Sequence, residues 1–305
     1  MAEFSIIDTY FNRQNSHSVD LGVGDDSALL TPPLQQQLVI CADTLVAGRH
    51  FPLNTSPHAI GWKSVAVNLS DIAAMGAQPQ SILLALSLDH IDHDWLKGFS
   101  QGLYDCCDQY GVSLIGGDTT QSPHLTISVT ALGWVEKNKA VKRSGAQVGD
   151  YICISGTVGD AAFTLQHLGH PLQKRLDYPT PRCELGVILK DYAHSMIDIS
   201  DGLAQDLGHI LKASNVGAIL DVEQLPLSPA LTTLAQMQYL QYALAGGDDY
   251  ELCFTLSAEH FTQLKIQYPH LEITKIGQIT EELGLKFTQN KQPLLLKFNG
   301  YQHFA

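Results

Sequence analysis

The stretch "LGVGDDSALL", from Leu21 to Leu30, begins as a phosphate-binding glycine turn and then continues with two acids. Gly22 and Gly24 predict a tight turn that brings backbone N–H groups close to an anion. Asp25 and Asp26 would repel that same anion. A cation between the carboxylates and the phosphate resolves this conflict, so the stretch predicts metal-mediated phosphate binding.

Two common nucleotide-binding folds fit this sequence poorly. Ser27 stands where a dinucleotide fingerprint has its third glycine, and the neighbouring acids would face the pyrophosphate. No GxxxxGK[ST] sequence occurs in the 305 residues, so a P-loop protein is also a poor fit. A second glycine-rich corner, "GGDTT" at residues 116–120, offers backbone N–H groups and two hydroxyls beside Asp118. The sequence therefore favours a fold that binds nucleotide phosphate through metals held by aspartates.

Composition and charge limit the class of protein. With 45% hydrophobic and 16% charged residues, the 305-residue chain predicts a globular protein of two domains. Lys plus Arg number 18 against 31 Asp plus Glu, a net charge of −13, which makes nucleic acid and anionic membranes poor partners.

Targeting signals and cysteine spacing point to a location. The six cysteines show no CxxC spacing and read as core residues in a reducing compartment. The N-terminus lacks the pattern of a signal peptide, and the uncharged run at residues 72–88 is too short and polar to span a bilayer. We expect a soluble, cytoplasmic protein.

Helical and strand patterns alternate along the chain, which predicts an α/β (α+β) fold. In the first half we expect helices over 54–77 and 93–111, and strands over 37–43, 81–88, 112–117 and 125–135. In the second half we expect helices over 158–169, 201–214 and 257–267, and strands over 151–156, 195–200, 217–222, 250–256 and 272–279. The polar stretch 136–150 separates the halves and predicts domains at 1–137 and 138–305.

Many aspartates directly adjoin apolar strands or glycines, where an unpaired carboxylate is costly. They are Asp26, Asp43, Asp71, Asp118, Asp198, Asp201, Asp248 and Asp249. So many carboxylates at strand ends call for a common partner, and oxygen-rich sites that share ligands with phosphate select Mg²⁺. Asp201 also fits a simpler role as the N-cap of the helix that follows it.

Seven motifs occur together and in order: "GVGDDSALL", "DTLVAGRHF", "AVNLSDIAAMGAQP", "LIGGDTT", "KRSGAQVGD", "IDISDGLAQDLGHI" and "GGDDYELCFT". Together with the closing "GYQHF", they resemble the thiamine-monophosphate kinase family over nearly the whole chain. The wider superfamily includes aminoimidazole-ribonucleotide synthetase and selenophosphate synthetase. The resemblance implies a two-domain fold of the aminoimidazole-ribonucleotide synthetase type. It also implies a homodimer whose N-terminal mixed sheets pair in a barrel-like interface with ATP bound nearby, and a C-terminal α/β domain that completes the site.

The resemblance further implies an activity and a set of site residues. The reaction would be direct in-line transfer of the ATP γ-phosphoryl group to thiamine phosphate, giving thiamine diphosphate and ADP, with several Mg²⁺ ions. The implied magnesium ligands are Asp26, Asp43, Asp71, Asp118, Asp198 and Asp201, of which Asp43, Asp71 and Asp118 are implied to be catalytic. The implied nucleotide contacts are Gly117, Asp118, Arg143, Ser200 and Tyr104, and the implied substrate contacts are His50, Asp248 and Tyr301.

Several of these residues also fit ordinary structural roles. His50 fits a histidine at the core edge, Arg143 an exposed charge of the linker, and Tyr104 the flank of a helix core face. Tyr301 fits packing of the C-terminus, although an aromatic face also suits a cationic thiazolium ring.

Two departures from the family pattern concern the site directly. Cys41 and Ala42 precede Asp43 where the family usually has hydroxyl residues that could reach a metal. Asp248 stands where the family commonly has glutamate, which withdraws the carboxylate by one methylene.

Two other functions remain compatible with the motifs. One is a different ATP-dependent synthetase of the same superfamily, although no cysteine precedes Cys41 as selenophosphate chemistry would favour. The other is a catalytically silent nucleotide-binding scaffold. Loss of several aspartates would favour it, but all of them are present.

Overall fold

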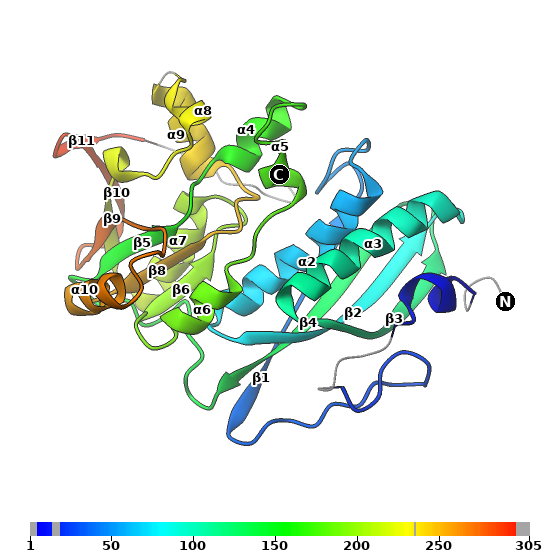
Figure 1. The fold of residues 1–305 in the computed structure, drawn as a ribbon. Helices are drawn as coiled ribbons and strands as arrows, with labels where there is room; N and C mark the ends of the chain where they lie inside the picture. Colours follow the sequence, from blue (N-terminus) through cyan, green and yellow to red (C-terminus); the bar gives the residue numbers. More distant parts are fainter. Residues whose placement is uncertain (1–4, 14–18, 235, 297–305) are drawn as a thin grey trace. The chain divides into compact units, whose positions relative to one another are not determined.

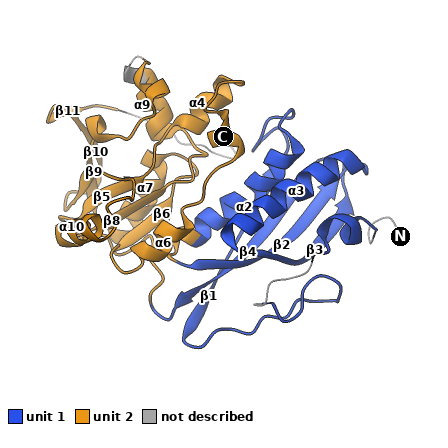
Figure 2. Ribbon diagram, viewed as in Figure 1, with its two compact units in different colours: residues 1–72, 77–138 blue, residues 73–76, 139–305 orange. Residues whose placement is uncertain are grey.

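Two compact units make up the chain in this computed structural model, which describes residues 5–13, 19–234 and 236–296. Unit 1 contains residues 1–72 and 77–138, and unit 2 contains residues 73–76 and 139–305 (Figure 2). The short segment 73–76, just after the Asp71 region of the sequence, groups with unit 2 and was not expected from the sequence.

A mixed sheet with two long helices on one face forms unit 1 (Figure 1). Its elements are η1 (Ile7–Phe11), β1 (Gln36–Val46), α2 (Pro57–Ala74), β2 (Gln78–Leu88), α3 (His93–Tyr110), β3 (Ser113–Gln121) and β4 (Thr126–Glu136). Among the described residues the sheet has four strands in the order β1-β4-β2-β3. β4 pairs antiparallel with β1 and β2, and β2 pairs parallel with β3.

Local sequence signals set the ends of both long helices. Pro57 occupies the first position of α2, and the Ser56 hydroxyl accepts a hydrogen bond from the Ala59 N–H at 3.2 Å. Gly111 ends α3 in the left-handed conformation, with φ 66°. Both helix ends therefore carry residue types that favour capping.

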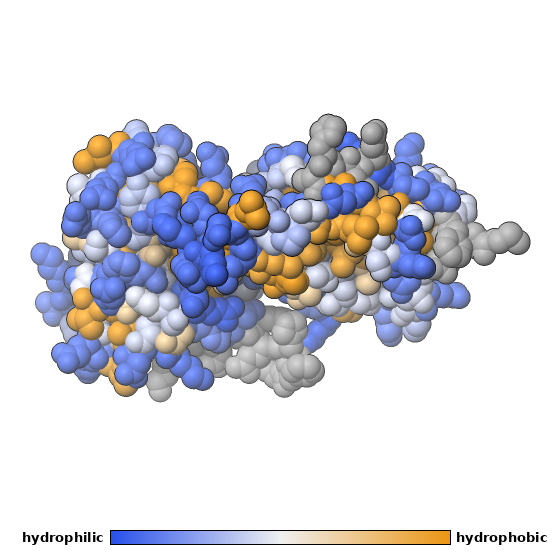
Figure 3. Space-filling model, turned by 90° about the horizontal axis from the view of Figure 1, so that it is seen from below, coloured by the Kyte–Doolittle hydropathy of each residue, from blue (hydrophilic) through white to orange (hydrophobic). Residues whose placement is uncertain are grey.

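Alternation along β4 divides the two faces of the unit 1 sheet. Ile127, Val129 and Ala131 are fully buried, and every second residue between them is only half-buried. The other face carries apolar side chains as well, since Leu38 and Ile40 of β1 stand opposite Trp134 and Leu132 of β4 in the strand register. The exposed fractions of Leu38 and Ile40 are 42% and 59%. Figure 3 shows apolar side chains gathered on this unit.

A larger sheet with helices organises unit 2. Its strands are β5 (Tyr151–Ser155), β6 (Ser195–Asp198), β7 (Gly217–Asp221), β8 (Leu252–Leu256), β9 (Ile273–Thr280), β10 (Gly284–Gln289) and β11 (Gln292–Leu294). Its helices are α4 (Asp160–Gln166), α5 (Gln173–Asp177), α6 (Cys183–Leu189), α7 (Leu203–Ser214), η2 (Val222–Gln224), α8 (Pro229–Thr232), α9 (Gln236–Ala245) and α10 (Ala258–Gln267). The described strands form a seven-stranded sheet in the order β11-β10-β7-β9-β5-β8-β6.

The core of unit 2 lies around its central strands. β8 is buried at every position and β5 at four of five, so both faces of these strands are covered. α7 places Leu203, Leu207 and Ile210 in the main apolar cluster. The α/β fold expected from the sequence is confirmed, but α5, α6, α8, α9, β10 and β11 were not predicted.

Cysteine and membrane expectations can be compared with the described part of the chain. All six cysteines lie within it as free thiols, and five of them are buried. No helix among the described residues has the length and apolar character needed to cross a membrane.

Candidate active site

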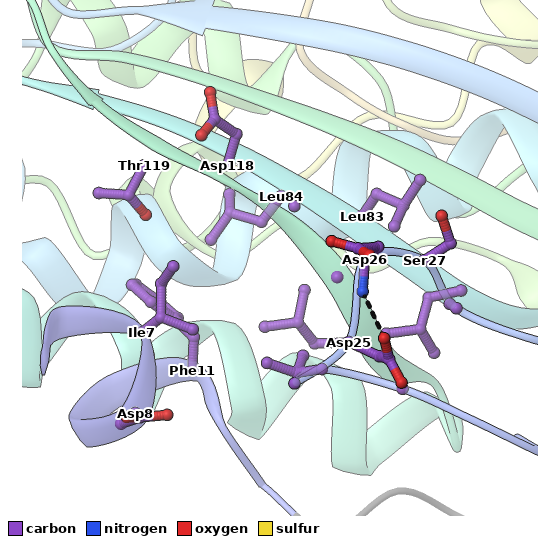
Figure 4. Close-up of a pocket in the computed structure, with 18 of the residues that line it drawn as sticks. Ile7, Asp8, Phe11, Asp25, Asp26, Ser27, Leu83, Leu84, Asp118 and Thr119 are labelled. Atoms are coloured by element: carbon purple, nitrogen blue, oxygen red, sulfur yellow. Dashed lines mark hydrogen bonds between the residues drawn. The ribbon is translucent and has the colours of Figure 1, made fainter. Parts of the chain in front are cut away.

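The glycine turn of residues 22–28 forms one wall of a pocket within unit 1, with a volume of about 1030 Å³ (Figure 4). Ile7 and Phe11 of η1, Leu84 of β2 and Ile115 of β3 give it an apolar lining. Its acids are Asp8, Asp25, Asp26 and Asp118. An apolar cavity with a few carboxylates at its wall suits an aromatic base attached to a polar, metal-binding tail.

Asp25 and Asp26 have different surroundings in this turn. The Asp25 carboxylate folds back and accepts a hydrogen bond from the Asp26 N–H at 2.9 Å (Figure 4). The Asp26 side chain is exposed and lines the pocket. Asp25 thus stabilises the turn, and Asp26 remains the carboxylate of this turn best placed to face a ligand.

Gly117 and Asp118 reach the pocket from β3. The backbone of Gly117 has φ 151°, and a Cβ at this position would lie 1.8 Å from the carbonyl oxygen of Leu84. Only glycine allows β2 and β3 to approach this closely. Asp118 follows directly and is exposed in the same pocket. The predicted nucleotide residues Gly117 and Asp118 therefore share one cavity with the predicted metal ligand Asp26.

A second group of acids surrounds Cys41, where β1 passes α2. The Asp43 N–H donates to Asn68 Oδ1 at 3.0 Å, and Cys41 Sγ donates to the Asn68 carbonyl at 3.4 Å. Burial raises the pKa of the Cys41 thiol, and the charges of Asp71 and Asp43 raise it further. The structure thus brings Asp43 and Asp71 near a thiol that stays protonated at neutral pH.

Each of these two groups includes one acid on an outer strand of the unit 1 sheet. Asp43 belongs to β1 and Asp118 to β3, the two outer strands, with β4 and β2 between them. Asp43 is level with Val129, Val129 with Leu84, and Leu84 with Gly117. Three strand spacings separate the edges by about 14 Å. A single Mg²⁺, whose ligand oxygens lie about 2.1 Å away, cannot bridge that distance within one chain.

The predicted metal ligands do not gather in one compact cluster within the described residues, and their role as ligands stays a prediction. Within residues 5–13, 19–234 and 236–296, no group of three or more His, Cys, Asp or Glu side chains is arranged to hold one ion. The donor chemistry nevertheless fits Mg²⁺, because the predicted ligands offer carboxylate oxygens and the one nearby sulfur stays protonated.

His50 and Tyr104 are both held by the backbone. His50 Nδ1 accepts from the Val46 N–H at 2.9 Å, so the neutral ring carries its proton on Nε2. The carbonyl of His50 accepts from the buried Lys63 at 3.3 Å. The Tyr104 hydroxyl donates to the carbonyl of Phe11 at 2.8 Å. This bond supports the η1 wall of the pocket.

Three acids meet at the end of β6 in unit 2. Asp206 Oδ2 accepts backbone N–H bonds from Ser200, Asp201 and Gly202 at 3.0–3.1 Å. Burial raises the pKa of Asp206 to about 7, with a further contribution from the negative charge of Asp198. The alternative interpretation of Asp201 as an N-cap is wrong, because α7 begins at Leu203 after Gly202, without a side-chain cap from the described residues.

Backbone hydrogen bonds hold Asp248 next to the turn that follows β6. Its N–H donates to the Ser200 carbonyl at 3.0 Å, and the Tyr250 N–H donates to the Ile199 carbonyl at 2.9 Å. Asp248 and Tyr250 both adopt the left-handed conformation, with φ 67° and 50°, which is uncommon without glycine. The Tyr250 hydroxyl donates to Asp248 Oδ1 at 2.9 Å. The predicted residues Ser200, Asp201 and Asp248 are thus neighbours within unit 2.

The remaining predicted residues have less structural context. Arg143 is exposed, and its carbonyl accepts from the Ser214 hydroxyl at 3.3 Å. Tyr301 lies outside the described residues.

Sequence reasoning missed three buried polar residues beside predicted site residues, Asn68 in unit 1 and Asp206 and Glu251 in unit 2. Asp206 could have been found, because it follows Leu203 by three residues and so lies on the apolar face of an amphipathic helix. Asn68 likewise interrupts the apolar face of α2. Glu251 gave no such signal, since it directly follows two other acids and a tyrosine.

The fold of unit 1 defines the class of the protein. Residues 24–135, which contain Asp26, Asp43, Asp71 and Asp118, match the family described as AIR synthase related protein, N-terminal domain. Over the whole chain, the thiamine-monophosphate kinase of Escherichia coli (strain K12) is 46% identical across 320 residues, covering 99% of this chain and 98% of the relative. The chain belongs to the thiamine-monophosphate kinase family.

Solved structures agree with that assignment. The thiamine-monophosphate kinase of Stenotrophomonas maltophilia K279a is 44% identical with a TM-score of 0.84, covering 91% of this chain and 93% of that one. A structure of AaThiL complexed with AMPPCP and TMP is 31% identical with a TM-score of 0.77, covering 90% and 89%. The family resemblance and the aminoimidazole-ribonucleotide synthetase type of fold are confirmed, and the alternative superfamily synthetase and the silent scaffold are not favoured.

Proposed function

We propose that this protein transfers the γ-phosphoryl group of ATP to thiamine phosphate, giving thiamine diphosphate and ADP. The observation that carries the proposal is the 46% identity to a thiamine-monophosphate kinase over nearly the full length of the chain. It is supported by a pocket that is lined by Asp26, Gly117 and Asp118. The acceptor is a phosphate monoester that is already ionised near neutral pH, so no strong general base is required. Catalysis then rests on positioning and on neutralising charge, which favours direct in-line transfer.

The pocket of unit 1 suits ATP. Its apolar wall, formed in part by Ile7 and Phe11, offers contact area for the adenine ring. Gly117 and Asp118 at the other side would face the phosphates. Tyr104 contributes by holding the backbone of Phe11 through its hydroxyl. Arg143 and Ser200 of unit 2 are proposed as further nucleotide contacts.

Mg²⁺ is the proposed metal. Asp26 and Asp118 at the pocket, Asp43 and Asp71 beside Cys41, and Asp198 and Asp201 at the end of β6 would hold it. When bound, the metal would supply positive charge that offsets the negative charge of the phosphates during transfer. This chain's contribution is to hold the carboxylates at fixed places: Asn68 secures the backbone of Asp43, and Asp206 secures that of Asp201.

His50, Asp248 and Tyr301 are the proposed contacts of thiamine phosphate. His50 would present its Nε2–H as a donor, because its Nδ1 is occupied by the Val46 N–H. Asp248 would present a carboxylate to the cationic thiamine, with its position set by Tyr250.

A homodimer is proposed from the open face of the unit 1 sheet. Leu38 and Ile40 expose large apolar side chains there, and β1 and β3 are edge strands with free pairing potential. Two such sheets joined edge to edge around a two-fold axis would place each β1 beside β3 of the partner subunit. That arrangement unites Asp43 and Asp71 of one subunit with Asp118 of the partner subunit. Pairing β1 with β1 instead would leave these carboxylates apart.

The cytoplasm is the proposed location, supported by six free thiols and by the use of ATP.

One assay tests the activity. The purified protein is incubated with ATP, Mg²⁺ and thiamine phosphate, and thiamine diphosphate and ADP are both quantified. We expect the two products in equal amounts. The matched controls omit thiamine phosphate, or replace it with unphosphorylated thiamine. Absence of thiamine diphosphate above the no-enzyme level would refute the kinase proposal. ADP formed without a phosphorylated acceptor would point to a different ATP-dependent reaction.

A further inference from the structure

A buried carboxylate lies directly behind the turn that carries Asp248. Glu251 has no exposed surface, and it accepts four hydrogen bonds. Arg182 donates from Nε and Nη2 at 2.6 Å each, Arg175 from Nη2 at 2.8 Å, and Ser155 from its hydroxyl at 2.5 Å. We call Ser155, Arg175, Arg182 and Glu251 the Glu251 network.

The backbone of Glu251 also fixes the turn that carries Asp248. The Glu251 carbonyl accepts from the Ile199 N–H at 2.8 Å, while the Tyr250 N–H donates back to the Ile199 carbonyl at 2.9 Å. Asp248 then bonds to Ser200, the next residue of that segment. Any shift of Glu251 therefore moves the segment that contains Ser200 and the left-handed residues Asp248 and Tyr250 together.

The network is poorly suited to a role in stability alone. Two residues beside it, Asp160 and Asp249, each have a buried Oδ1 without a hydrogen-bond partner among the described residues, and the same holds for Arg175 Nε. Burying charged groups with incomplete pairing costs free energy. Apolar residues of similar volume often stabilise a core as well as a buried ion pair does. Gly156 also has to lack a side chain, because a Cβ there would overlap Glu251 Oε1 and Arg182 Nη2. Such arrangements persist where they hold a strained functional segment in place.

We propose that Arg175 and Arg182 are positioning residues for thiamine phosphate binding. By holding Glu251 they fix the left-handed turn that presents the Asp248 carboxylate, without touching the substrate themselves. Arg182 uses Nε and Nη2 on Glu251, and Arg175 uses Nη2 on Glu251 and the Thr157 carbonyl with Asp160 nearby, which favours a positioning role over direct phosphate binding. This inference rests on the proposed function, in which Asp248 contacts the substrate.

The test compares Arg182→Gln and Arg175→Gln with a matched control in the same unit. His194→Asn is the control, because the His194 ring also meets a buried carboxylate, Asp150, at 2.9 Å but has no contact with the turn. Arg182→Lys keeps the charge without the two-pronged guanidinium, and it replaces Arg182→Gln if that variant fails to fold.

Two measurements are made on each folded variant. Hydrogen exchange reports the amides of residues 246–251 without any reference to activity, and steady-state kinetics gives KM for thiamine phosphate and kcat. We expect the glutamine variants to speed exchange at residues 248 and 250 and to raise KM at least about tenfold, with a much smaller loss in kcat. Arg182→Lys should lie between the wild type and Arg182→Gln, and His194→Asn should change thermal stability only.

The outcomes separate this inference from the proposed function. Unchanged exchange and KM in both glutamine variants, with a loss of thermal stability like that of the control, would overturn the positioning role. Faster exchange with an unchanged KM would overturn the link between the turn and substrate binding. A wild-type protein that makes no thiamine diphosphate would instead defeat the proposed function, while the exchange measurement would still decide whether the arginines hold the turn.

Discussion

Asp43 and Asp118 lie on opposite edge strands of the same four-stranded sheet, separated by β4 and β2. If both serve one phosphoryl-transfer site, that site needs a second subunit. The dimer is then part of the active site.

Mixed dimers test this consequence. Asp43→Asn and Asp118→Asn should each lose turnover as homodimers. In a dimer that contains one subunit of each kind, one site combines both substitutions and the other is wild type. Random mixing by co-expression should therefore restore about a quarter of the wild-type rate. Two different affinity tags isolate the mixed dimer, and no recovery in that species would place both carboxylates in a single-chain site.

The proposed dimer should depend on the open face of the unit 1 sheet. Ile40→Glu places a charge on a side chain that is 59% exposed in the single chain, and it should produce folded monomers. Ile266→Glu in α10 is the matched control, because Ile266 is even more exposed, at 75%, and lies in the other unit. Sedimentation velocity measures the mass of each variant. A dimeric Ile40→Glu protein would argue for a different interface.

Cys41→Ser should lower the Mg²⁺ concentration needed for half-maximal activity. The Cys41 thiol remains protonated at neutral pH, because burial and the neighbouring carboxylates raise its pKa, so it is a poor ligand for a hard cation. A serine hydroxyl of similar size offers an oxygen donor in the same place. Titration of activity with Mg²⁺ measures the change, with Cys107→Ser as control because Cys107 is buried in α3. Equal Mg²⁺ dependence in wild type and Cys41→Ser would show that this position does not reach the metal.

Asp71→Asn should abolish most turnover while the fold is retained. Asp71 lies beside Cys41 near Asp43, and an amide in its place keeps the shape but loses the charge that would hold Mg²⁺. We expect a loss of kcat of at least about a hundredfold, as for other groups that act in phosphoryl transfer. Circular dichroism checks the fold. Near wild-type turnover at low Mg²⁺ would remove Asp71 from the metal site.

Asp249 should make stability depend on pH. Burial raises its pKa well above the usual value, although the Gly159 N–H and Arg175 oppose that shift. Because the folded pKa lies above the unfolded one, the folded state is favoured at low pH and loses stability as pH rises above about 4. Asp249→Asn removes this loss. Urea unfolding between pH 4 and pH 7 should show that the free energy of unfolding of the wild type falls relative to that of the variant, by at most about 1.4 kcal/mol per pH unit. Parallel curves would contradict the shift.

The periodic elements of the fold were predictable from the sequence because their signals are local. Ser56 and Gly111 mark helix ends through capping chemistry, and the alternation of β4 separates its two faces without reference to the rest of the chain. α9 and β10 lacked such signals. α9 mixes glutamine, tyrosine and leucine with little polar separation, and the short β10 depends on pairing with the distant β7.

The candidate site was predictable in its residue types but not in its geometry. Aspartates beside glycines predict metal-dependent phosphate chemistry, and Asp26 and Asp118 do line the same pocket. That Asp43 falls on the opposite edge follows only from the strand order, which no local pattern encodes. Glu251 was missed for a related reason, since its two arginine partners lie 76 and 69 residues away.

The carboxylate of Asp206 has a consequence for how this enzyme meets inorganic anions. It occupies the three backbone N–H groups of Ser200, Asp201 and Gly202, at a helix start where many proteins bind phosphate or sulfate. The chain has thereby supplied its own hydrogen-bond acceptor at this corner. Free phosphate and sulfate find these donors already taken, so buffers rich in either ion should compete poorly here.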